Sequence, residues 1–160
     1  MPSQEHEWVK TTLTQVVEAV ALARDLHYRS LGSTTCGRED LARGFEPDAC
    51  FYLAHADAVA PDRPLDLTID PPPDFVIEVD ITRSSLDTLP IYAALGVPEV
   101  WRYTAGEVER RCLTGDAYTT SDPSRVLSGL NAGRVTRFMA EARTTANQTV
   151  WFKRVVATVS

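Results

Sequence analysis

Two acidic residues lie two positions apart in a strand-like segment near the middle of the chain. Residues 75–81 read Phe-Val-Ile-Glu-Val-Asp-Ile, so the odd positions form an apolar face and the even positions carry Glu78 and Asp80. This alternation predicts a β-strand and places the two carboxylates on one face, about 6–7 Å apart along the strand. A divalent metal ion is one way to compensate such neighbouring acids. A solvated strand face is the simpler alternative.

A third carboxylate lies at the start of an earlier apolar segment. The sequence Glu46-Pro-Asp-Ala-Cys-Phe-Tyr-Leu53 predicts a strand that begins at Asp48. If the two strands are neighbours, Asp48 comes to the same side of the sheet as Glu78. Acids held on rigid strands are typical of a metal site. Glu46 is either a further acid at the mouth of this site or a rim charge.

Three motifs together resemble a known family. They are Pro47-Asp48, Pro73-Asp74-Phe-Val-Ile-Glu78 and the run from Tyr92 to Trp101, and they resemble the Uma2 family, also called DUF820. Its members are bacterial endonuclease-like proteins, common in cyanobacteria, of the PD-(D/E)XK nuclease superfamily. The resemblance extends from about residue 4 to the last helix and is most specific over residues 91–103. It implies a single α/β domain over residues 1–160, with a restriction-endonuclease-like core in which a central mixed sheet is flanked by helices.

The resemblance also implies a function and a set of site residues. Asp48 and Glu78 match the family's metal-binding acids, and the backbone carbonyl of Val79 would add a third oxygen ligand for Mg²⁺ or Mn²⁺. The implied reaction is the hydrolysis of DNA phosphodiester bonds by a metal-activated water, with Asp80 or Glu46 assisting. The resemblance further implies a homodimer.

The lysine of the superfamily pattern is missing. That pattern places Lys two residues after the Glu, where this chain has Asp80, and Uma2-like sequences commonly carry it at the position of Thr88. No Lys lies between Lys10 and Lys153. Arg83 is the candidate replacement, because a guanidinium binds phosphate well although it is a poor general base.

Three hypotheses therefore stay open. The first is an active Mg²⁺-dependent endonuclease with Asp48, Glu78, Asp80, Arg83 and Thr88 at its site. The second is a catalytically impaired nuclease-like domain that binds DNA or a protein partner, or that assembles. The third is a structural domain without a ligand, which a large separation of Asp48 from Glu78 would favour.

Composition excludes some classes of protein. A 160-residue chain with 44% hydrophobic and 24% charged residues is typical of a globular domain. No apolar run is long enough for a transmembrane helix, and three cysteines without a close pair favour a reducing cytoplasm. The net charge of −6 argues against a strong non-specific nucleic-acid binder. Six arginines in the C-terminal half are interpreted as scattered surface cations: Arg102, Arg110, Arg111, Arg125, Arg134 and Arg137.

The first helix is expected over residues 4–26, with one apolar stripe. His6 matches a His at this helix start in relatives, and we interpret it as a surface residue; Glu18 is interpreted as solvated, with water-mediated help to a metal as the alternative. Relatives usually have a β-hairpin before this helix. The chain begins almost at the helix, so we expect a shortened N-terminal segment.

The remaining elements follow from periodicity and turn residues. We expect a short strand at 27–33, a turn at 32–38, an irregular connection at 54–72, and a helix at 89–95 that Gly96 ends. Three strands at 98–103, 107–113 and 117–120 form an antiparallel meander. Helices are expected at 127–139 and 141–156, and the last is apolar enough to be a core lid or a dimer surface.

Overall fold

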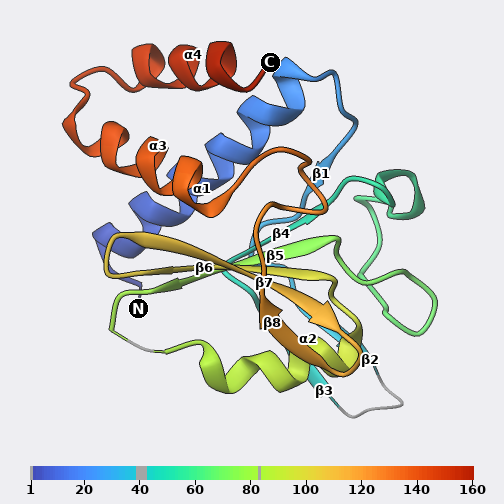
Figure 1. The fold of residues 1–160 in the computed structure, drawn as a ribbon. Coiled ribbons are helices and arrows are strands. Elements are labelled where there is room, and N and C mark those ends of the chain that lie inside the picture. Colours follow the sequence, from blue (N-terminus) through green and yellow to red (C-terminus); the bar gives the residue numbers. More distant parts are fainter. Residues whose placement is uncertain (1, 39–42, 83) are drawn as a thin grey trace.

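The computed structural model describes residues 2–38, 43–82 and 84–160, and its centre is a mixed β-sheet (Figure 1). The strand order in this six-stranded sheet is β1-β4-β5-β6-β7-β8. Only the β5–β6 pair is parallel, and the other neighbours are antiparallel. The strands are β1 (Arg29–Ser30), β4 (Ala49–Tyr52), β5 (Phe75–Asp80), β6 (Glu99–Thr104), β7 (Glu107–Thr114) and β8 (Ala117–Thr120). The predicted mixed sheet and its meander over β6, β7 and β8 are confirmed.

Three helices cover one face of the sheet, and a short helix covers the other (Figure 1). The three are α1 (Gln4–Ala23), α3 (Ala132–Thr144) and α4 (Gln148–Val159). Their apolar residues form the main core with the odd-numbered residues of β5, among them Phe75 and Ile77. Trp151 and Val155 of α4 are buried in this core, so α4 has the role of a core lid.

The other face of β5 is divided between apolar and acidic residues. Val76 packs against α2 (Leu89–Leu95) in a second core cluster that contains Cys50 and Tyr92. Glu78 and Asp80 follow Val76 along the same face, because side chains alternate along a strand. The alternation predicted for residues 75–81 is therefore confirmed, and α2 begins beside the acidic part of the face.

Helix α2 has the predicted bounds, and its two ends have clear causes. Pro90 stands in the first turn, where its missing N–H costs no hydrogen bond. Gly96 ends the helix in the left-handed conformation at φ 78°, which glycine adopts without the steric cost that a Cβ brings. These two residues fix how far α2 extends over the sheet.

Two sequence-based expectations were wrong. Residues 36–38, expected in a turn, form β2 (Cys36–Arg38), which pairs with β3 (Arg43–Phe45) in a separate two-stranded sheet; three residues are too few to show a strand period. The last two helices are also shifted: the expected break near residue 140 lies inside α3.

Asparagine caps explain the true bounds of these helices. The side chain of Asn131 accepts from the Arg134 N–H and that of Asn147 from the Val150 N–H, and each cap satisfies an otherwise unpaired helix donor. No described helix is long and apolar enough to cross a membrane. The three cysteines are free and buried.

Candidate functional site

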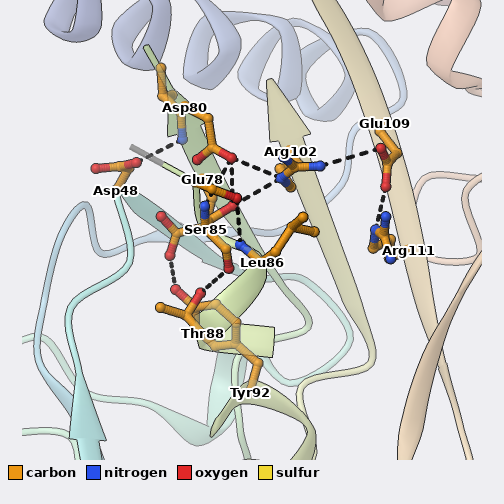
Figure 2. Close-up of polar contacts among 12 residues, drawn as sticks. Asp48, Glu78, Asp80, Ser85, Leu86, Thr88, Tyr92, Arg102, Glu109 and Arg111 are labelled. Carbon is orange, nitrogen blue, oxygen red and sulfur yellow. Dashed lines mark hydrogen bonds and ion pairs between the residues drawn. The ribbon is translucent and has the colours of Figure 1, made fainter. Parts of the chain in front are cut away.

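Asp48 and Glu78 lie opposite each other on neighbouring strands. Ala49 pairs with Ile77 in the antiparallel β4–β5 register, so Asp48, one residue further out, comes opposite Glu78. The Val79 N–H donates a 2.7 Å hydrogen bond to Asp48 Oδ2 (Figure 2). The two acids therefore lie side by side, as predicted. A large distance between them would have favoured a structural domain without a ligand, and the structure does not show one.

Glu78 lies in a partly buried, acidic environment. Burial raises its pKa to about 9, and the nearby carboxylate of Asp48, followed by that of Asp80, adds to the shift. The hydroxyl of Tyr92 on α2 donates to Glu78 Oε1 (Figure 2). Without a bound cation, Glu78 therefore keeps its proton at neutral pH. Tyr92 is buried, as predicted, but its hydrogen bond to the site was not foreseen.

Asp80 is engaged by a different set of groups. Its Oδ2 accepts from the Ser85 N–H at 2.9 Å and from the Ser85 hydroxyl at 3.0 Å. It also accepts from Arg102 Nε at 2.8 Å. Asp80 thus holds the start of the segment that leads into α2, and it forms a buried ion pair with β6.

Arg102 is the main functional candidate that the sequence interpretation missed. It stands beside Glu78 in the parallel β5–β6 register, is only 9% exposed, and lies between Asp80 and Glu109 (Figure 2). The expectation of a surface cation is wrong for Arg102. It is also wrong for Arg110, which is buried and donates to the Leu130 carbonyl. A possible signal was the strand run Val100-Trp101-Arg102-Tyr103, which sets Arg102 on the face of Glu78 once the strands pair.

Thr88 occupies the position at which Uma2-like sequences commonly carry the lysine, and its side chain brings no charge to the site. The Thr88 hydroxyl donates to the Ser85 carbonyl at 2.6 Å, so Thr88 helps to fold the segment before α2. Arg83 lies outside the described residues.

Helix α1 brings a histidine to the site. His6 Nε2 lies 3.1 Å from Asp48 Oδ1, and the Ser3 side chain caps the helix by accepting from the His6 N–H. The interpretation of His6 as a surface residue is therefore wrong. The fold packs the first turn of α1 against the entry of β4, a contact between segments some 40 residues apart that no local pattern reveals.

Two further acidic residues, Glu18 and Glu46, lie near the site but form hydrogen bonds with other residues. Glu18 on α1 hydrogen-bonds Tyr28, and burial raises its pKa; it lines a pocket that Asp48 also lines. Glu46 is exposed and accepts from the Thr35 hydroxyl at 2.9 Å, which makes it a rim charge. Within residues 2–38, 43–82 and 84–160, no group of three or more His, Cys, Asp or Glu side chains could hold a metal ion.

Comparisons with known proteins agree with this fold. The model of the Uma2 family, described as "Putative restriction endonuclease", matches residues 1–140. A solved structure from Anabaena variabilis, described as "a putative nuclease belonging to DUF820", is similar with a TM-score of 0.62 and 13% identity, over 87% of this chain and 84% of that chain. At this identity the likeness shows the fold alone. No curated protein matches. Because the family model spans most of its length, this chain belongs to the Uma2 family and has a nuclease-like fold.

Proposed function

We propose that this chain is a metal-dependent DNA endonuclease of Uma2 type, which hydrolyses phosphodiester bonds. The observation that carries the proposal is the Asp48–Glu78 pair. Two acids from neighbouring strands face each other in a largely buried position, and burial, together with the nearby carboxylates of Asp48 and Asp80, raises the pKa of Glu78 to about 9. Such uncompensated acids on rigid elements are typical of a site that takes a cation.

The donor chemistry of the pair suits Mg²⁺ or Mn²⁺. Magnesium is usually held by one or two carboxylates, with water and substrate phosphates completing the shell, and Asp48 and Glu78 supply two. The backbone carbonyl of Val79, whose N–H already bonds Asp48, would be the third oxygen ligand. When bound, such a cation polarises the phosphate and lowers the pKa of the attacking water.

The chain's own groups orient these carboxylates. Asp48 is fixed through one oxygen by the Val79 N–H and through the other by His6. Glu78 is fixed by the Tyr92 hydroxyl, and its raised pKa keeps it protonated at neutral pH when no cation is bound. Outer contacts of this kind keep ligands in one orientation and tune their affinity.

Arg102 supplies the positive charge that the superfamily pattern assigns to a lysine. The residue at the lysine position, Asp80, would add a third negative charge, and the guanidinium of Arg102 offsets it through a 2.8 Å hydrogen bond. In this proposal Asp80 assists indirectly, because it holds Arg102 and Ser85 next to the acid pair. Thr88 positions the same segment through Ser85.

A specific observation also favours a second candidate, an impaired nuclease-like domain that binds DNA or a protein. Arg102 is buried and bonded to Asp80, Ser85 and Glu109, so it is poorly placed to leave these partners for a phosphate. A domain that kept the acids without a mobile cation would bind metal but not cleave.

Calorimetry with Mn²⁺ and a plasmid-nicking assay, run on the same samples, separate the candidates. The wild type is compared with Glu78→Ala and with Asp116→Ala, a control that removes an exposed acid from the β7–β8 turn. Binding and nicking lost only in Glu78→Ala support the endonuclease. Binding without nicking by the wild type supports the impaired domain. Absence of binding overturns the metal site.

A further inference from the structure

A small pocket opens on the side of Asp48 that faces helix α1. It has a volume of about 240 Å³ and lies between α1, the end of β1 and the entry of β4. The lining residues that matter here are Lys10, Thr11, Thr14, Gln15, Glu18 and Asp48. This volume is below the ~300–1,000 Å³ of sites that enclose drug-sized ligands. The pocket therefore suits one small polar group rather than a whole nucleotide.

Helix α1 presents a row of polar side chains to this pocket. Lys10, Thr14 and Glu18 follow one another at four-residue spacing, which sets them on one side of a helix, and Thr11 and Gln15 lie beside them. His6, one step earlier in the same row, contacts Asp48. This row of side chains therefore runs along α1 from the contact with Asp48, a proposed metal ligand, into the pocket.

The donors in this row are available to a ligand. Lys10 Nζ lies 2.9 Å from Glu7 Oε2, and both side chains are partly exposed, so the ammonium group can turn from Glu7 toward a ligand in the pocket. Gln15 accepts from Gln148 through its carbonyl oxygen, which leaves its amide hydrogens free to donate. Across the part of the chain that the structure describes, no hydrogen bond engages the hydroxyls of Thr11 and Thr14.

We propose that this pocket binds a backbone phosphate of the DNA strand next to the cleaved bond, with Lys10 as the charged contact. An ammonium group with hydroxyl and amide donors matches the oxygens of a phosphodiester. Glu18, whose pKa burial raises, closes the far end and restricts the ligand to the Lys10 side. The inference rests on the proposed DNA substrate and makes Lys10 a positioning residue.

The chain contains two lysines, so chemical labelling tests the proposal with an internal control. Acetylation of Lys10 and of Lys153, which is exposed on α4, is measured by mass spectrometry with and without a 20-base-pair duplex, in EDTA and again in Ca²⁺. We expect the duplex to protect Lys10 and leave Lys153 reactive. Equal reactivity of both lysines, or no DNA binding, overturns the proposal. Equal protection by inorganic phosphate alone would also overturn it, because the pocket would then be a free-anion site.

A conservative substitution gives a second measurement. Lys10→Gln removes the charge from a partly exposed helix position, and Lys153→Gln is the control on α4. We expect Lys10→Gln to weaken duplex binding and to reduce the slope of log K against log salt by about one, as loss of one phosphate contact predicts. An unchanged slope overturns the proposal. Lys10-dependent binding without nicking would refute the proposed endonuclease alone, whereas nicking that is indifferent to Lys10 would refute only the phosphate pocket.

Discussion

Arg102 stands beside Glu78 in the parallel register of β5 and β6, but its Nε bonds Asp80, two residues further along β5. Both partners of this ion pair are at least 90% buried. A buried charge that loses its partner is strongly destabilised, whereas loss of both charges is tolerated far better. Removal of one partner of the Arg102–Asp80 ion pair should therefore destabilise the protein more than removal of both.

Arg102→Met should reduce the free energy of unfolding by about 3–5 kcal/mol, the usual cost of leaving one buried charge unpaired. The double variant Arg102→Met, Asp80→Asn should recover a large part of the loss. Urea denaturation of the metal-free protein measures both. Arg111→Met, which removes the neighbouring and more exposed arginine paired with Glu109, should cost under about 1 kcal/mol. Equal losses for Arg102→Met and Arg111→Met would contradict this prediction.

Gly96→Ala should destabilise the protein by roughly 1 kcal/mol. Gly96 has φ 78°, and only a side-chain atom at 3.9 Å lies near the place of a new Cβ, so the cost comes from backbone conformation and not from crowding. Gly133→Ala is the control, because Gly133 is exposed in the first turn of α3 and Ala has the higher helix propensity. Thermal unfolding should move in opposite directions for the two variants; a decrease of similar size in both would indicate another cause.

Local patterns predicted most of the elements and the acid pair, although they missed β2 and the break between α3 and α4. Alternation set Glu78 on the face opposite the core, Pro90 and Gly96 gave the bounds of α2, and the position of Asp48 at a strand start predicted its approach to Glu78. Each of these inferences depends on a few consecutive residues, which is the range over which periodicity and turn chemistry act.

The parts of the site that were missed depend on contacts between distant segments. Arg102 is buried because β6 pairs in parallel with β5, which brings it to Asp80 across 22 residues. His6 reaches Asp48 because α1 crosses the entry of β4. Both contacts depend on how distant segments pack, so an arginine or histidine of this kind is easily taken for a surface residue.

The stability of the metal-free protein should fall as the pH rises from about 5 to about 9. The unfolded chain releases the Glu78 proton near the ordinary value of 4.5, whereas the folded protein keeps it until about pH 9. Between these values the unfolded state binds fewer protons, so rising pH favours unfolding by up to about 1.4 kcal/mol per pH unit from this group.

Glu78→Gln should remove this contribution, because the amide does not titrate and can still accept from Tyr92. Urea denaturation in EDTA across pH 5–9 measures the slope. Glu107→Gln, which changes an exposed glutamate at the start of β7, should retain the wild-type slope. The predicted ionisation of Glu78 is wrong if Glu78→Gln and the wild type show the same pH dependence.

His6→Ala should weaken Mn²⁺ binding by about 10-fold without abolishing it. His6 Nε2 lies 3.1 Å from Asp48 Oδ1, and removal of a group that orients a ligating carboxylate typically costs 10–100-fold in metal affinity. Calorimetric titration compares His6→Ala with His27→Ala, because His27 is half-exposed and pairs with Asp57, outside the site. A His6→Ala affinity within twofold of the wild type would show that the Val79 N–H alone orients Asp48. A tenfold loss in His27→Ala as well would mean that the effect is not specific to the site, so the prediction requires the two histidines to differ.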